Sequence, residues 1–264
     1  MKSASMPELP EAETLRRYLE TNSLRKVIER IDIRNERILD NIFPKQLKKS
    51  LEGSRFFLSE RYGKRIFLGL NDDLLLTIHL GMSGWFDYLS KRESEPSHTR
   101  VLIIFADGSR LVYRDPRMFG RIGLTNSIKS FIREKNLGPD ALKMDLQTYL
   151  NVISKRKGTI KAMLLDQSIV AGLGNLYADE SLFQAGIRPD VRGLDEARLV
   201  LLFKCIKDVL STAISIKADF GLFPVTFLIT RRIVGGRCPM DGVSLERIRI
   251  GGRTSYYCPY HQKS

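Results

Sequence analysis

The sequence has few cysteines and lacks any long run of apolar residues. Three cysteines among 264 residues are too few, and odd in number, for a disulfide framework, so they favour a reducing compartment. No stretch is apolar for long enough to cross a membrane, and we find no signal-like segment, low-complexity tract or internal repeat. We therefore expect a cytoplasmic protein with no targeting signal.

Acidic residues are too few to balance the basic ones. The chain has 43 Lys and Arg residues against 30 Asp and Glu, which gives a net charge of +13 and a pI of about 9.7. Such an excess suits a polyanionic partner, and nucleic acid is the leading candidate. A membrane surface is the alternative, which the lack of a long apolar run disfavours. The length allows a sizeable core and two domains.

The first part of the chain alternates between apolar and polar residues, as short strands do. Seven strands are expected, at Val27–Arg34, Arg55–Tyr62, Arg65–Leu70, Leu74–His79, Trp85–Leu89, Arg100–Phe105 and Arg110–Tyr113. Asn71-Asp72-Asp73 and Asp107-Gly108 supply turns between them. Short strands at this spacing predict a β-sandwich.

From about Ser127 the pattern becomes helical. Helices are expected at Ser127–Lys135, Asp145–Ile153, Ile160–Leu165, Asn175–Ala185 and Asp195–Ala213, the last with Asp195 as its N-cap. From Thr226 short β segments return, separated by glycine pairs. The predicted fold class is therefore α+β. A β-sandwich domain (residues 1–126) and a linker (127–138) precede a helical domain (139–225) and a small β tail (226–264).

The segment Met6-Pro7-Glu8-Leu9-Pro10-Glu11 carries the strongest chemical signal. If the chain began at Pro7, this residue would have a free secondary amine, which can attack an activated sugar carbon and form an iminium. Glu8 could then exchange protons in the same reaction. Pro10 and Glu11 suit the first turn of a helix. The alternative is a simple turn before that helix.

Four segments, MPELPE, HLGMSG, DPRMFG and GLGNLYADE, together resemble the formamidopyrimidine-DNA glycosylase and endonuclease VIII family of repair enzymes, and most closely formamidopyrimidine-DNA glycosylase. The resemblance runs from Met6 to Lys263. It implies an N-terminal catalytic sandwich with an N-terminal helix, a helix-two-turns-helix DNA-binding domain and a zinc-finger-like β-hairpin. It further implies a bifunctional glycosylase and AP lyase in which Pro7 is the nucleophile, Glu8 the general acid/base and Lys64 a phosphate ligand. The alternative for Lys64 is a solvated turn residue.

Residues 1–5 depart from this pattern, because a preceding peptide bond turns Pro7 into an amide without a nucleophilic lone pair. We expect translation to start at Met6, or the leader to be removed. Lys2 and Lys64 carry the spare amines if neither occurs. The alternative function is a non-catalytic module that binds damaged DNA while Pro7 stays blocked.

The resemblance assigns DNA contacts to five residues. Met82, Arg117 and Phe119 would fill the gap left when a nucleotide is flipped out of the duplex, whereas a core methionine and a surface turn are the alternatives. Asn175 and Arg253 would contact phosphates. His98, just before a strand, is a further candidate for a DNA contact, and a plain loop histidine explains it at least as well. Glu180 is matched more weakly, because a solvated helix residue explains it equally well. Backbone N–H groups at the start of the helix from Asn175 would form an anion site, with Asn175 as the cap of that helix. The run Lys155, Arg156, Lys157 and Lys161 favours DNA near Asn175.

The tail places Cys238 and Asp241 in one pair and Cys258 and His261 in another. In the resembling family this spacing belongs to four cysteines that hold zinc. Thiolate, carboxylate and imidazole are all zinc ligands, so these four residues predict one structural zinc ion. The alternative is a hairpin that has lost its metal and holds by packing.

The resemblance therefore predicts a monomer that excises oxidised bases from duplex DNA with no organic cofactor, in the cytoplasm and associated with the nucleoid. The iminium would be followed by β- and then δ-elimination of the strand. Between Phe220 and Cys238 the chain is shorter than relatives with a lesion-capping loop. Such a loop folds over an extruded 8-oxoguanine, so its shortening disfavours a preference for 8-oxoguanine and leaves formamidopyrimidines or oxidised pyrimidines as substrates.

Overall fold

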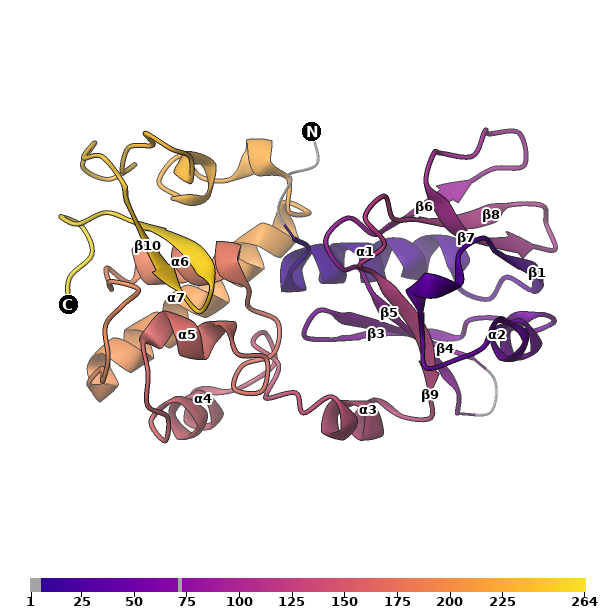
Figure 1. Ribbon diagram of the computed structural model, residues 1–264, viewed down its shortest axis with the longest axis horizontal. Coiled ribbons are helices and arrows are strands. Elements are labelled where there is room, and N and C mark those ends of the chain that lie inside the picture. The colour runs from indigo at the N-terminus through magenta and orange to yellow at the C-terminus, as the bar shows by residue number, and fades with distance from the viewer. Residues whose placement is uncertain (1–5, 71–72) are drawn as a thin grey trace. The chain divides into compact units, whose positions relative to one another are not determined.

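The computed structural model describes residues 6–70 and 73–264 (Figure 1). The described chain forms two compact units: a sandwich unit of Met6, Pro7 and Glu11–Lys135, and a helical unit of Glu8–Pro10 and Asn136–Ser264. Lys2 and two of the predicted turn residues, at positions 71 and 72, lie outside the described residues. In residues 6–70 and 73–264, no helix is both long and apolar enough to span a bilayer.

Two sheets build the sandwich unit. The four-stranded sheet has the order β1 (Ile28–Ile33), β7 (Thr99–Phe105), β8 (Arg110–Arg114) and β6 (Trp85–Leu89). The five-stranded sheet has the order β2 (Leu39–Asp40), β9 (Arg121–Thr125), β5 (Leu75–His79), β4 (Arg65–Gly69) and β3 (Leu58–Tyr62). All strand pairs are antiparallel except β2 with β9. The predicted sandwich is confirmed.

One apolar core joins both sheets of this unit to its helices. Alternate residues of β4 and β7, such as Ile66 and Val101, belong to the same buried cluster as Leu15 and Leu19 of α1 (Leu9–Ser23). Helix α1 therefore buries the apolar face that its sequence predicts. The sequence analysis missed α2 (Pro44–Leu51), and α3 (Ile128–Glu134) occupies most of the predicted linker.

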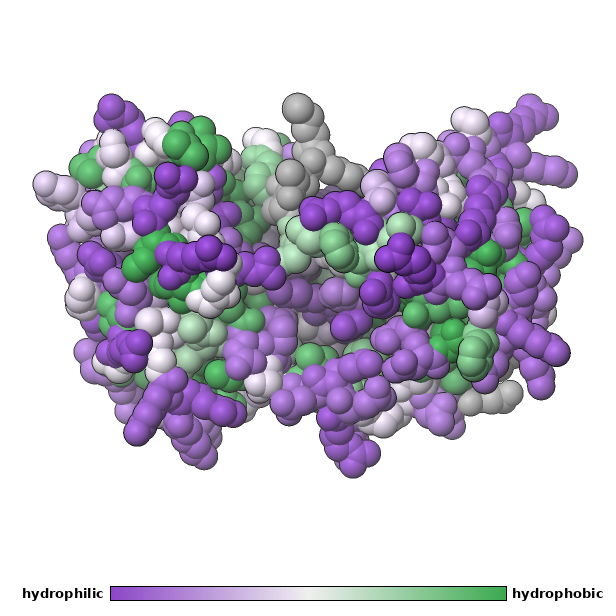
Figure 2. Space-filling model, viewed as in Figure 1, coloured by the Kyte–Doolittle hydropathy of each residue, from purple (hydrophilic) through white to green (hydrophobic). Residues whose placement is uncertain are grey.

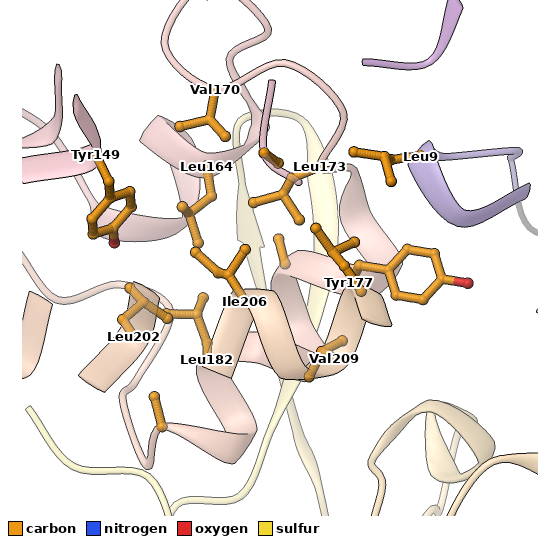
Figure 3. Close-up of a cluster of buried hydrophobic side chains, with 14 of the residues drawn as sticks. Leu9, Tyr149, Leu164, Val170, Leu173, Tyr177, Leu182, Leu202, Ile206 and Val209 are labelled. Carbon is orange, nitrogen blue, oxygen red and sulfur yellow. The ribbon is translucent and has the colours of Figure 1, made fainter. Parts of the chain in front are cut away.

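The helical unit contains α4 (Leu146–Ile153), α5 (Ile160–Leu165), α6 (Asn175–Gln184) and α7 (Glu196–Ser215). Figure 3 shows apolar side chains of these helices meeting in one core, with Leu164, Tyr177, Leu182 and Ile206 among them. Helix α6 is buried at every residue between its first and its last. Any polar side chain on α6 must therefore find a partner inside the protein.

The tail belongs to the helical unit and contains one hairpin, β10 (Glu246–Ile250) and β11 (Arg253–Tyr257). The β segments predicted just after Thr226 are wrong, because the chain there forms a 3₁₀ turn, η3 (Ile229–Arg231), after an earlier turn, η2 (Phe220–Leu222). Hydrophilic residues cover much of the face of both units seen in Figure 2, as expected for a chain rich in charge.

Candidate active site

Pro7 lies two residues before the start of helix α1 and is half-buried. The next residue, Glu8, belongs to the helical unit and is only 2% exposed. Its carboxylate accepts hydrogen bonds from the backbone N–H groups of Gly174 at 2.7 Å, Leu176 at 2.8 Å and Tyr177 at 3.4 Å. Glu8 therefore sits on the positive end of α6, where backbone N–H groups lack partners within the helix.

This arrangement corrects one expectation about α6. The predicted anion site at its start is real, but the anion is the carboxylate of Glu8. Asn175, predicted as a cap, is instead the first residue of the helix, and Gly174 stands at the N-cap. The sequence analysis missed this contact because more than 160 residues separate its two sides.

The two glycines of the GLG turn allow the N-terminal segment to approach. A Cβ at Gly174 would lie 2.4 Å from Cδ of Glu8, and one at Gly172 would lie 2.5 Å from Cδ1 of Leu9. Gly172 also has a φ of +115°, which residues with a side chain rarely adopt. The Leu9 N–H donates to Gly172 O at 3.1 Å, so backbone contact fixes the segment as well.

In the sandwich unit, the HLGMSG and DPRMFG turns lie against each other. A Cβ at Gly81 would come within 2.3 Å of the Phe119 carbonyl carbon and 2.4 Å of the Gly120 nitrogen. Only glycine permits this approach at a φ of +63°. The contact brings the turn that carries Met82 next to the turn that carries Phe119.

Asp115 holds these two turns together by accepting hydrogen bonds from both. It is fully buried, and it accepts hydrogen bonds from Ser83 Oγ, from Gly120 N at 2.7 Å and from Tyr113 OH at 3.4 Å. Its own N–H donates to the carbonyl of His98 at 3.1 Å, so the predicted loop histidine is tied to the same turn.

The predicted wedge side chains differ in exposure. Phe119 is 49% exposed and Arg117 is exposed, with its guanidinium 5.2 Å from the Phe119 ring centre. Met82 is half-buried. Met118 turns inward against the sandwich core at a φ of +54°, and Asn35 Nδ2 lies 3.2 Å from its sulfur. Met118 therefore packs against the core, whereas its neighbours Arg117 and Phe119 are exposed.

A row of basic residues, missed by the sequence analysis, crosses the end of the five-stranded sheet. Arg65, His79 and Arg121 are aligned on adjacent strands β4, β5 and β9, and Lys64 lies in the turn before β4. Burial, together with the charges of Arg65, Lys64 and Arg121, lowers the pKa of His79 to about 3. The histidine is thus neutral at pH 7, and the row gathers positive charge beside the wedge turns.

The helical unit contains a charged network around Asp179 that the sequence analysis also missed. Lys161 was predicted within a surface basic run, but its side chain is fully buried and pairs with Asp179 at 2.6 Å. Its Nζ also donates to Asn175 Oδ1 at 2.7 Å. The other Asp179 oxygen accepts from Arg232 at 2.7 Å. The available signal was an aspartate within a helix otherwise rich in apolar residues.

Glu180, next to Asp179, is fully buried, so its interpretation as a solvated residue is wrong. Its carboxylate accepts from Gln184 Nε2 at 2.7 Å and from the N–H groups of Leu228 at 3.2 Å and Ile229 at 2.7 Å. Burial raises its pKa to about 7, although these bonds and the charge of Arg232 oppose the shift. Glu180 therefore anchors the η3 turn to α6.

Three of the four predicted metal ligands come together in the tail. One sulfur each from Cys238 and Cys258 and one carboxylate oxygen of Asp241 lie within 4.8 Å of one another. The N–H groups of Met240 and His261 each lie 3.4 Å from one of these sulfurs. Burial raises the pKa of the Cys238 thiol to about 11, whereas a bound cation would favour the thiolate.

His261, the fourth predicted ligand, is not a member of this group. Its Nε2 hydrogen-bonds the carbonyl of Phe183 at 2.9 Å, and its ring packs on that of Phe183 with centroids 4.6 Å apart. The donor set of two thiols and one carboxylate nevertheless suits zinc. Arg253 is exposed at the start of β11, on the same hairpin.

Comparison with known proteins covers nearly the whole chain. Residues 6–122 match the family described as formamidopyrimidine-DNA glycosylase N-terminal domain, and residues 137–221 match its H2TH domain. The formamidopyrimidine-DNA glycosylase of Mycoplasma mobile is 33% identical over 269 residues, or 96% of this chain and 97% of that protein. The one from Heliobacterium modesticaldum is 35% identical over 279 residues, or 98% and 100%.

Solved structures agree. The Lactococcus lactis enzyme, bound non-covalently to DNA with an AP site, superposes with a TM-score of 0.87 at 30% identity, covering 98% of this chain and 100% of that chain. A MutM complex with DNA containing carbocyclic 8-oxo-G gives the same TM-score, identity and coverage.

Proposed function

The chain belongs to the formamidopyrimidine-DNA glycosylase family, and from this premise we propose that it is a bifunctional DNA glycosylase and AP lyase that removes oxidised bases from duplex DNA. The observation that carries the proposal is the position of Glu8. Its carboxylate is held by the first N–H groups of α6, within the GLGN signature. Two motifs far apart in the sequence therefore meet at the residue beside Pro7.

The chemistry starts at the Pro7 nitrogen. Once the residues before it are removed, its lone pair forms a bond to C1′ of the flipped nucleotide while the bond from C1′ to the base breaks. A proton passes to the departing base, and Glu8 is the group placed to transfer protons. The nitrogen then loses its own proton, and its lone pair expels the ring oxygen O4′, which takes up a proton, so the sugar opens and an iminium forms. The iminium acidifies the C2′ hydrogens, so β-elimination and then δ-elimination release the 3′ and 5′ phosphates in turn.

Duplex binding uses both units. Met82, Arg117 and Phe119 would occupy the gap left by the flipped nucleotide, because their two turns are locked side by side through Gly81 and Asp115. Phosphates would be held by the remaining candidates, Lys64, His98, Asn175 and Arg253. The basic row of Arg65 and Arg121 adds positive charge near the wedge turns.

We propose that one zinc ion is held by Cys238, Asp241 and Cys258. His261 lies outside this set with its Nε2 at Phe183 O, so its ring would have to turn toward the two thiols to provide the fourth ligand. When bound, the ion would clamp a hairpin too small to have a core of its own. Nothing in the glycosylase chemistry passes through it.

The substrate class follows from the family, and we propose formamidopyrimidines, with 8-oxoguanine and oxidised pyrimidines to be compared directly. The segment between Phe220 and Cys238 is short for a capping loop and contains the turns η2 and η3. Excision rates on matched duplexes that differ only in the lesion would rank these substrates.

The decisive experiment compares two proteins that differ only at the N-terminus, one starting at Pro7 and one retaining residues 1–6. The first should form a covalent adduct with abasic-site DNA in borohydride, and the second should form far less. Pro7→Gly in the first should reduce trapping sharply. Equal trapping by both proteins would move the nucleophile to a lysine, with Lys64 tested next. Duplex binding without any adduct would favour a non-catalytic damage-binding module.

A further inference from the structure

We propose that Asp179 is a positioning residue that holds two phosphate-binding side chains, those of Asn175 and Arg253, in place for DNA. The inference rests on the proposed function, because that function makes these two residues phosphate ligands. Asp179 is 1% exposed, so it cannot reach DNA itself. It acts through the groups that its carboxylate orders.

The first route runs through Lys161 to Asn175. The Lys161 ammonium lies 2.6 Å from Asp179 Oδ1 and donates to Asn175 Oδ1 at 2.7 Å. Because the ammonium occupies the carbonyl end of the Asn175 amide, the N–H₂ end is turned to the other side. One of its hydrogens binds Thr254 O at 2.9 Å, and the second is left to donate. The orientation of Asn175 thus depends on where Asp179 holds Lys161.

The second route runs through strand β11 to Arg253. Asp179 accepts from Ser255 Oγ at 2.6 Å and from Tyr256 N at 3.2 Å. Together with the bond from Asn175 to Thr254, these contacts lay β11 along α6. Alternate residues of a strand share a face, so Arg253 is on the same face as Ser255, one step nearer the start of α6. The contacts of Asp179 with Ser255 and Tyr256 therefore also set the position of the strand end from which the exposed Arg253 side chain extends.

The charges explain why this position holds a carboxylate. Asp179 faces two cations, Lys161 at Oδ1 and Arg232 at Oδ2. Arg232 donates from Nε at 3.1 Å and from Nη2 at 2.7 Å. Arg232 also lies over the ring of Tyr256, at 5.3 Å. An amide would keep the shape but could satisfy neither cation fully, so α5, the segment after η3 and β11 would each loosen.

A purely structural role makes a different prediction from a positioning role. Destabilisation lowers the fraction of folded protein but leaves the number of phosphate contacts per bound complex unchanged. The contacts made by Lys and Arg are counted from the dependence of log K on log salt concentration, whose slope changes by about 0.9 for each phosphate that such a residue neutralises in duplex DNA. The salt slope is therefore the readout that separates the two roles.

The test measures binding of the full chain to a duplex with an uncleavable tetrahydrofuran abasic site, from about 50 to 200 mM salt. Arg253→Ala is the reference and should lower the slope by about 0.9. Asp179→Asn should lower it by up to the same amount, because Arg253 is the charged one of the two side chains that Asp179 places. Introduced into Arg253→Ala, it should change the slope little, because that charged contact is already lost. Ser255→Ala removes one contact to Asp179 and should give an intermediate slope.

Ser181→Ala is the matched control. Ser181 lies on α6, is fully buried like Ser255, and donates its hydroxyl to Tyr177 O within the helix. It should keep the wild-type slope. If Asp179→Asn does not fold, Ser255→Ala against Ser181→Ala decides the question.

A wild-type slope in both Asp179→Asn and Ser255→Ala would overturn the inference, and so would an Arg253→Ala variant without effect. A wild type that binds with the expected slope but forms no borohydride adduct once it starts at Pro7 would overturn the proposed lyase instead. The two failures are therefore distinguishable.

Discussion

Each unit has a buried aspartate at its centre, and the two differ in what they bind. In the sandwich unit, the hydrogen bonds to the Asp115 carboxylate come from neutral donors, the hydroxyls of Ser83 and Tyr113 and the N–H of Gly120. In the helical unit, Asp179 pairs with the cations of Lys161 and Arg232 in addition to neutral donors.

The difference follows from what the backbone already holds in place. The two turns joined by Asp115 extend from strands that are paired within the sheets of the sandwich, so only their last few residues need alignment. No sheet pairing connects α6 to helix α5, to the segment after η3 or to strand β11. Asp179 contacts one residue or more of each and so joins all three to α6. Charge-assisted hydrogen bonds are stronger than neutral ones, and here they occur where strand pairing does not already hold the segments together.

The largest expected effect tests the difference between the two aspartates directly. Asp179→Asn should lower the free energy of unfolding by about 3–5 kcal/mol, because it leaves two buried or half-buried cations without a full partner. Asp115→Asn keeps an acceptor among neutral donors and should cost about 1–3 kcal/mol. Denaturant unfolding of both variants measures the difference.

Lys161→Met provides the control for charge. Added to Asp179→Asn, it removes one stranded cation and should recover part of the lost stability, whereas it has no such partner in Asp115→Asn. Equal costs for the two aspartates, with no recovery, would show that the cations do not distinguish the two sites.

Sequence patterns predicted the elements of both units better than the bonds between them. The apolar and polar pattern of short segments located β4 to β8, and the apolar spacing of Leu15 and Leu19 located α1, because these signals are local. Strand β9 was missed because its pattern is interrupted by Gly123, where a Cβ would lie 2.9 Å from Asp40 O of β2. That glycine makes sense only beside its partner strand.

The candidate site shows the same division. The glycines around Met82 and the ligand spacing in the tail could be identified from sequence, because each lies within one short motif. The contact between the Glu8 carboxylate and the start of α6 depends on segments that only folding brings together, and so does the burial of Lys161. A useful signal was nevertheless present in α6, where Asp179 and Glu180 interrupt a helix that is otherwise mostly apolar.

The next prediction compares two buried carboxylates on the same helix. Asp179 is paired with cations, whereas the hydrogen bonds to Glu180 all come from neutral donors. Burial raises the pKa of Glu180 from 4.5 to about 7, so between these values the folded state holds a proton that the unfolded state has released. Its contribution to stability is therefore full below pH 4.5 and falls as pH rises to about 7, by roughly 3 kcal/mol.

Glu180→Gln removes this titration and serves as the control. The difference in unfolding free energy between wild type and variant should shift in favour of the variant from pH 4.5 to 7 and stay constant above that. A difference that does not change with pH would mean that Glu180 is ionised throughout, stabilised by its N–H donors.

The smallest effect compares one hydroxyl at each aspartate. Ser83→Ala removes the donor to Asp115 Oδ1 and the acceptor of the Arg117 N–H at 3.1 Å, and should cost about 1–3 kcal/mol. Ser255→Ala removes a donor to Asp179 Oδ1, but Lys161 still satisfies that oxygen, so about 0.5–1.5 kcal/mol is expected. Unfolding of both variants in denaturant measures the order. A larger cost at Ser255 would mean that the cations around Asp179 do not replace a lost neutral donor, and that its network depends on every bond, as the network around Asp115 does.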